Sequence, residues 1–169
     1  AVATAQAGAT NKVATAETPD TLTATVGDLS LQFNKKTGLL AAASRAGKTY
    51  SFLNGPRLLA ANPTPAPPAR GATAPAPLPP LPESTLTSFT QKADGNDLLL
   101  TAAFDGPMKS ITYRLRSNGW LTIDYAYNLT GPHEYYGVGF DYPEANVQGI
   151  RYLGNGPAPV YQNRLAGGT

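Results

Sequence analysis

Four carboxylates in the C-terminal half of the chain are the residues that could take part in hydrolytic chemistry. They are Asp124, Glu134, Asp141 and Glu144. Hydrolysis of a glycosidic bond needs two carboxyl groups held roughly 5–10 Å apart across the bond. All four lie in predicted strands and turns, where acidic side chains are usually solvated surface groups. We therefore expect no catalytic pair within this chain.

Other catalytic signatures are absent from the sequence. It has no Gly-x-Ser-x-Gly nucleophile elbow and no glycine-rich phosphate loop leading from a strand into a helix. It has no cysteine, which excludes disulfides, thiolate metal sites and cysteine nucleophiles. His133 is the only histidine, so a multi-histidine zinc or iron site cannot form within the chain. We expect no metal and no other cofactor.

Two side chains could contact a sugar without cleaving it. His133 lies in a predicted loop over residues 130–134, and its imidazole can hydrogen-bond a hydroxyl group. Trp120 follows the Asn118-Gly119 turn, and its amphipathic ring can stack on the apolar face of a pyranose. Both also have ordinary structural interpretations. A lone loop histidine is commonly incidental, and a tryptophan at the start of a strand can cover a sheet edge.

The charge pattern argues against nucleic acid as a partner. Thirteen basic and eleven acidic residues leave a formal charge of +2, and no lysine or arginine run can follow a phosphate backbone. No segment approaches the roughly 18 apolar residues of a membrane span, so we expect no membrane partner. Residues 1–8 lack the basic and long apolar regions of an intact signal peptide.

The elements that must position these residues are β-strands. From residue 21 onward, apolar and polar residues alternate with period two, and turn residues such as Asn118-Gly119 separate the alternating segments. No segment has a helical period with caps. The predicted strands cover residues 29–33, 39–43, 49–53, 86–91, 97–104, 111–115, 121–129, 136–142 and 147–153.

Nine or ten strands joined mostly by short turns predict an all-β fold, an antiparallel β-sandwich. The fullest apolar row lies in the strand over residues 121–129, and we expect it to face the core. Its members are Leu121, Ile123, Tyr125, Tyr127 and Leu129.

Two segments break the strand pattern. Residues 1–20 are small and polar, and we expect a linker or disordered tail there. Residues 56–83 contain ten of the sixteen prolines, which cannot donate to a strand ladder. We interpret them as a long proline-rich loop inserted into a sandwich domain over residues 21–169. A docking ligand for a proline-recognition domain is the alternative.

Two sequence blocks resemble a known family. Residues 29–40 (LSLQFNKKTGLL) resemble the strand and hairpin that open the C-terminal small-chain domain of β-galactosidases, which are family 2 glycoside hydrolases. Residues 149–164 (GIRYLGNGPAPVYQNR) resemble the same domain's Tyr/Leu-Gly-x-Gly-Pro-x-x-x-Tyr-x-x-Arg block. The order and separation of the blocks also fit. The family's Arg-Ala-Pro-x-Asp-Asn-Asp stretch is replaced here by the proline-rich insert.

The resemblance implies a supersandwich similar to the galactose-mutarotase fold, incomplete here because the second half of the domain would follow Thr169. In that family both catalytic glutamates lie in a separate (β/α)₈ barrel, against which this domain packs and whose sugar pocket it helps to shape. The expected partners are therefore carbohydrate and the catalytic domain of the parent enzyme. No catalytic residue transfers. Asn155, Tyr161 and Arg164 form a candidate carbohydrate-binding surface, together with Trp120 and His133.

The leading hypothesis is thus a non-catalytic accessory domain of a carbohydrate-active enzyme, and we expect a periplasmic or extracellular location. Three alternatives stay open. The first is a free-standing carbohydrate-binding module, suggested by nine tyrosines and Trp120. The second is a mutarotase or epimerase, although enzymes of that kind use more than one histidine. The third is a purely structural adhesion-type sandwich.

Overall fold

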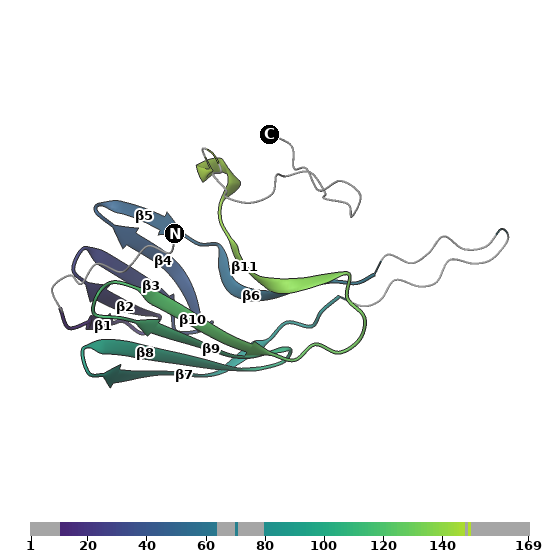
Figure 1. Cartoon of the computed structure of the whole chain (residues 1–169), viewed down its shortest axis with the longest axis horizontal. Coiled ribbons are helices and arrows are strands. Elements are labelled where there is room, and N and C mark those ends of the chain that lie inside the picture. Colours follow the sequence, from purple (N-terminus) through teal and green to yellow (C-terminus); the bar gives the residue numbers. More distant parts are fainter. Residues whose placement is uncertain (1–10, 64–69, 71–79, 148, 150–169) are drawn as a thin grey trace, which may run out of the picture.

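The predicted all-β fold is confirmed. A computed structural model describes residues 11–63, 70, 80–147 and 149 of the chain. Within these residues every strand pairing is antiparallel, and the sole helical element is a three-residue 3-10 turn, η1 (Glu144–Asn146). Two larger sheets and a two-stranded ribbon make up a β-sandwich (Figure 1).

The first sheet is a five-stranded meander in which each strand pairs with the next in sequence. Its third turn shows how the local sequence directs the chain. The Asn34 side-chain oxygen accepts hydrogen bonds from the backbone amides of Lys36 (2.8 Å) and Thr37 (3.2 Å), and Gly38 takes a positive φ of 70°. The strands are β1 (Ala14–Glu17), β2 (Thr21–Val26), β3 (Leu29–Asn34), β4 (Leu39–Arg45) and β5 (Lys48–Ser51).

The second sheet has four strands in the order β10-β9-β8-β7. Its last hairpin uses the predicted Asn118-Gly119 turn, in which the Gly119 amide donates to the Arg116 carbonyl (2.9 Å) and Gly119 has φ of 83°. The strands are β7 (Thr85–Asp94), β8 (Asp97–Asp105), β9 (Met108–Leu115) and β10 (Leu121–Tyr127).

The two-stranded ribbon joins segments that lie far apart in the sequence. It pairs β6 (Asn54–Ala61) with β11 (Tyr135–Asp141). Two residues that connect β5 to β6 hydrogen-bond to both parts: the Phe52 amide donates to the Ala41 carbonyl of the first sheet, and the Leu53 amide donates to the Asp141 carbonyl of the ribbon, both at 2.8 Å. In Figure 1 the ribbon continues the first layer and lies across from the second sheet.

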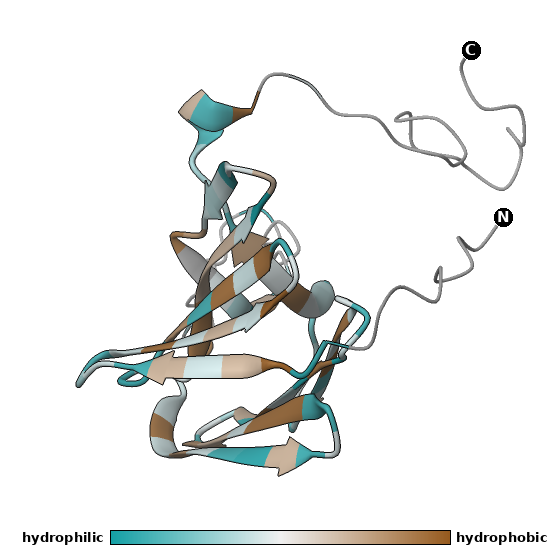
Figure 2. Ribbon diagram, turned by 90° about the vertical axis from the view of Figure 1, so that its left-hand side faces the viewer, coloured by the Kyte–Doolittle hydropathy of each residue, from teal (hydrophilic) through white to brown (hydrophobic). Residues whose placement is uncertain are grey.

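The core lies between the two sheets, which both supply buried side chains. Hydrophobic and hydrophilic residues alternate along the strands in Figure 2, as a two-layer sandwich requires. At the centre, the ring of Phe33 meets that of Tyr113 edge-on with centroids 4.9 Å apart. The other fully buried large side chains are Leu22, Leu100, Ile111, Leu115 and Pro56.

The predicted tail over residues 1–20 is wrong in its second half, where β1 forms. All four β1 side chains are exposed, so the strand is ordered by backbone pairing with β2 rather than by burial. Val13, just before it, is buried in the core, and its amide donates to the carbonyl of Asn96 (3.0 Å). Val13 is therefore the residue in this segment that indicates an ordered chain before β1.

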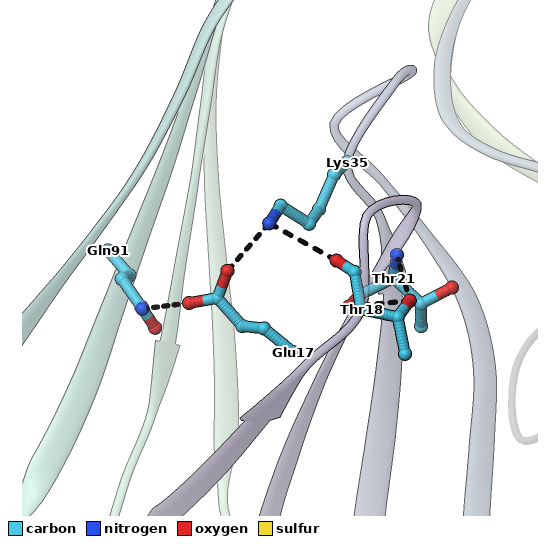
Figure 3. Close-up of polar contacts among 5 residues, drawn as sticks. All are labelled: Glu17, Thr18, Thr21, Lys35 and Gln91. Atoms are coloured by element: carbon cyan, nitrogen blue, oxygen red, sulfur yellow. Dashed lines mark hydrogen bonds and ion pairs between the residues drawn. The ribbon is translucent and has the colours of Figure 1, made fainter.

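A polar network anchors the end of β1 to both sheets (Figure 3). The Glu17 carboxylate accepts a hydrogen bond from the Lys35 side chain, in the β3–β4 turn of the first sheet (2.6 Å). It accepts another from the side-chain amide of Gln91, on β7 of the second sheet. The bond and charge of Lys35 hold the pKa of Glu17 below its usual value. Glu17 therefore ties the two layers together at one side of the sandwich.

The predicted proline-rich loop over residues 56–83 also begins too early. Residues 56–61 belong to β6, whose partner β11 lies more than 70 residues further along the chain. Only Asn62, Pro63, Arg70 and residues 80–83 of the predicted loop are described outside a strand. The predicted strand over residues 147–153 lies outside the described residues, apart from Val147 and Gly149.

Candidate functional site

Three tyrosines on neighbouring edge strands form an exposed group that we name the aromatic face. It consists of Tyr125 and Tyr127 of β10 and Tyr136 of β11. The rings of Tyr125 and Tyr127 lie 6.2 Å apart at an interplanar angle of 22°, and Tyr127 meets Tyr136 at 6.3 Å and 61°. Their exposed fractions are 48%, 36% and 61%.

The aromatic face corrects the prediction that the apolar row of β10 is buried throughout. Leu121 and Ile123 do pack against the core, whereas Tyr125 and Tyr127, further along the same row, are exposed. On β11, Val138 packs against the core while Tyr136 is exposed. Side chains separated by two residues share one face of a strand. The aromatic face is therefore an uncovered continuation of the sandwich interior.

The backbone edges beside this face are also uncovered. β10 ends the order of its sheet, and β11 pairs only with β6 within the part of the chain that the structure describes. Sheet edges present unpaired amide and carbonyl groups, and proteins usually shorten, charge or cover them. Aromatic side chains beside two such edges are typical of a surface that contacts another molecule.

A cavity of about 280 Å³ has Asn128, the residue that follows Tyr127 of the aromatic face, in its lining. It lies where the chain leaves β10, and its lining includes residues 128–133 together with residues 80–82. His133 is one of the lining residues. Both of its imidazole nitrogens are inaccessible to solvent, and neither has a hydrogen-bond partner among the described residues.

The predicted binding residues do not gather at one place. Trp120 precedes β10 and is about half exposed, whereas His133 follows the strand. The seven-residue strand β10, roughly 20 Å long, lies between them in the sequence, and Trp120 does not line the cavity beside His133. Asn155, Tyr161 and Arg164 lie outside the described residues. The alternation of β10 predicts that its tyrosines face the core, whereas the structure exposes Tyr125 and Tyr127. Their amphipathic side chains were the signal for partial exposure.

The four candidate carboxylates do not line the cavity beside His133. They are also absent from the lining of a larger cavity of about 600 Å³ between β6 and the second sheet, which contains Leu39, Leu58 and Met108. Asp141 forms a two-point ion pair with Arg57, with Nε–Oδ2 and Nη2–Oδ1 distances of 2.9 and 3.2 Å. That geometry suits a structural role across the β6–β11 ribbon.

The perturbed ionisable groups have structural explanations. A hydrogen bond from Arg114 (2.5 Å), reinforced by its charge, lowers the pKa of Asp94 and ties β9 to the β7–β8 turn. Burial raises the pKa of Tyr113, whose hydroxyl donates to the Gly38 carbonyl (3.1 Å). These groups hold hairpins in place.

The described residues contain no group of three or more His, Asp or Glu side chains that could hold a metal ion. Nor do they include a helix with the length and hydrophobicity needed to cross a membrane.

Comparisons with family models, with curated proteins and with solved structures give no match for this chain.

Proposed function

We propose that this chain is a non-catalytic β-sandwich domain of a carbohydrate-active enzyme, of the family 2 glycoside hydrolase type. It packs against the catalytic barrel of its parent enzyme and helps to shape the sugar site. The family assignment rests on the sequence blocks at residues 29–40 and 149–164. We expect the parent enzyme to be periplasmic or extracellular.

The aromatic face is the observation that carries the proposal. Tyr125, Tyr127 and Tyr136 point the same way as core side chains, yet no described part of the chain covers them. Burying such rings against another polypeptide is favourable, at about 25 cal/mol per Å² of apolar surface. Tyrosine suits this position because its ring is apolar and its hydroxyl can keep a polar partner. A neighbouring domain of the same enzyme is the partner that fits.

The placement of the acidic residues supports a non-catalytic role. Asp141 is engaged by Arg57, and Asp124 is an exposed residue of β10. A hydrolytic site would need two carboxylates facing a common cavity. The catalytic groups are therefore assigned to the parent enzyme.

A footprinting experiment tests the proposed packing. The isolated chain and the native polypeptide that contains it are exposed to hydroxyl radicals, and oxidation is quantified for each tyrosine. We expect Tyr125, Tyr127 and Tyr136 to be oxidised several-fold more slowly in the native polypeptide. Tyr50 is the matched control, because it is 47% exposed and lies on β5. Its oxidation should not change.

Two results would contradict the proposal. One is equal oxidation of the aromatic face in both samples. The other is a native polypeptide no longer than these 169 residues, whether it hydrolyses glycosides itself or acts without a catalytic domain. A free-standing chain that binds sugars through its tyrosines would instead favour the alternative of a carbohydrate-binding module.

A further inference from the structure

Among the edges of the two larger sheets, β10 has the least protection against pairing with another strand. β1 and β5 are edges of only four residues each, and β7 carries Lys92 and Asp94. β10 has seven residues, contains no proline and has Asp124 as its only charge. Proteins usually shorten, charge or bulge an edge that must stay unpaired. β10 therefore has the features of an edge that receives a partner strand.

The pairing of β10 with β9 uses alternate residues of the strand. The Arg116 amide donates to the Trp120 carbonyl at 2.8 Å, and the ladder between the two strands continues this pairing in register. Hydrogen-bonded pairs alternate with non-hydrogen-bonded pairs along an antiparallel ladder. The β10 residues that bond to β9 are therefore Thr122, Asp124 and Ala126.

The intervening residues present their backbone groups at the free edge. They are Leu121, Ile123 and Tyr125, and their amides and carbonyls point away from β9. These groups form no hydrogen bond with another part of the described chain. A further antiparallel strand on this side would exchange backbone hydrogen bonds with the same three residues.

The inner face of β10 defines half of the side chains of such a strand. Residues directly opposite each other in an antiparallel pair lie on the same face of the sheet. Those opposite Ile123 and Tyr125 would extend the interior of the sandwich and lie beside the aromatic face. Apolar side chains are favoured there, because they remove the exposed flank of these residues from water.

The outer face of β10 defines the charge of the partner. Asp124 is exposed, and Arg114, whose guanidinium bonds Asp94, acts on Asp124 only through its charge. Opposite charges directly across two strands stabilise the pair, whereas like charges destabilise it. The residue that fits opposite Asp124 is therefore a lysine or an arginine.

We propose that β10 binds an extended strand of the native enzyme by antiparallel strand addition, with apolar residues opposite Ile123 and Tyr125 and a basic residue opposite Asp124. The strand comes from outside the described residues. This assignment deepens the proposed function and rests on it for the source of the strand. It states how the polypeptide that covers the aromatic face is held beside it.

Hydrogen exchange of single backbone amides tests the pairing. It is measured by mass spectrometry with electron-transfer fragmentation, on the isolated chain and on the native polypeptide that contains it. We expect the amides of Leu121, Ile123 and Tyr125 to exchange about tenfold or more slowly in the native polypeptide. The amides of Thr122 and Asp124 are the internal control. They already bond to β9 and should exchange slowly in both samples.

Two synthetic peptides test the chemistry of the partner. Acetyl-TVKVTVT-amide places lysine opposite Asp124 and valine opposite Ile123 and Tyr125, and acetyl-TVEVTVT-amide differs only by a glutamate at the lysine position. Each is titrated into the isolated chain, and affinity is measured from the amide NMR signals of β10. We expect the lysine peptide to bind about two- to fivefold more tightly, the usual size of a cross-strand charge effect.

Charge reversal separates recognition from folding. Asp124→Lys should reverse the preference between the two peptides, because the position is exposed and the fold does not depend on its charge. Asp105→Lys is the matched control, at an exposed position at the end of β8 in the same sheet, and should leave the preference unchanged.

Equal exchange of the Leu121, Ile123 and Tyr125 amides in both samples would overturn strand addition. If the tyrosines of the aromatic face were still protected from oxidation, the proposed function would stand, and loss of both kinds of protection would contradict both proposals. Failure of the lysine peptide to bind, or an unchanged preference in Asp124→Lys, would overturn the stated partner. Sedimentation showing that the isolated chain dimerises with these amides protected would also overturn it, because a second copy would then occupy the edge.

Discussion

Tyr113 contributes to the structure through one buried polar atom. Its ring is fully buried against Phe33, and its hydroxyl donates to the Gly38 carbonyl in the β3–β4 turn. A hydrogen bond across the core thus fixes a turn of the first sheet to a strand of the second. Burial raises the pKa of the phenol, outweighing the hydrogen bond with the backbone of Leu40.

We predict that Tyr113→Phe lowers the free energy of unfolding by about 1 kcal/mol at pH 7, because the Gly38 carbonyl loses its partner. In the wild type, the raised pKa contributes stability that is complete below pH 10, the unfolded value, and is lost as pH rises further. That loss approaches 1.4 kcal/mol per pH unit, and the variant lacks it. Urea denaturation of both proteins from pH 7 to 11 should show that the difference in their free energies of unfolding shrinks above pH 10. A difference that stays constant over this range would contradict a raised pKa for Tyr113.

At the scale of elements, the β3–β4 hairpin is held by close packing as well as by turn chemistry. Gly38 has φ of 70°, and a β-carbon there would lie 2.8 Å from that of Ala102 on β8. Gly27, between β2 and β3, has φ of 58° and nothing within 4 Å of the same position. Both glycines permit left-handed backbone, but only Gly38 also permits the two sheets to approach.

This pair of glycines gives a matched prediction. Gly27→Ala should cost about 1 kcal/mol, the penalty for a left-handed alanine. Gly38→Ala should cost about 2–4 kcal/mol, because overpacking against Ala102 adds to that penalty. Chemical denaturation of the two variants measures the difference. Equal costs would mean that the sheets separate easily beside this turn.

At the scale of the whole molecule, the two sheets share one core. Leu22 and Phe33 from the first sheet and Leu100 and Ile111 from the second belong to a single buried cluster. Glu17 connects the same layers at the side (Figure 3). Layers that share a core are expected to unfold together, as small domains usually do.

Phe33→Ala tests this cooperativity. Trp120 is the sole tryptophan and lies beside the second sheet, whereas Phe33 lies in the first. We expect the change to cost about 3–5 kcal/mol and to lower the midpoint of Trp120 fluorescence and of circular dichroism equally. Tyr50→Ala, at an exposed site of the first sheet, is the control and should change stability by under about 0.5 kcal/mol. Separate midpoints in Phe33→Ala would show that the sheets unfold independently.

The sequence alone determined the local β structure. Period-two alternation and turns such as Asn118-Gly119 identified most hairpins of both sheets, because adjacent antiparallel strands depend on nearby residues. Tyr113 lies in the predicted strand over residues 111–115, and the structure buries it together with Ile111 and Leu115 on the same face. The assignment to a carbohydrate-active family remains a proposal drawn from sequence blocks.

Only the tertiary structure decided which strands join across long distances and which apolar rows are covered. β6 pairs with β11 although β6 contains a proline. β1 is ordered by pairing with the edge of β2, and the small polar residues of β1 do not by themselves predict a strand. Tyr125 and Ile123 occupy equivalent positions in the pattern of β10, yet one is exposed and the other packs against the core. The alternation of a strand fixes the side to which a side chain points. Whether anything lies on that side depends on the opposing layer, which is built from distant parts of the chain.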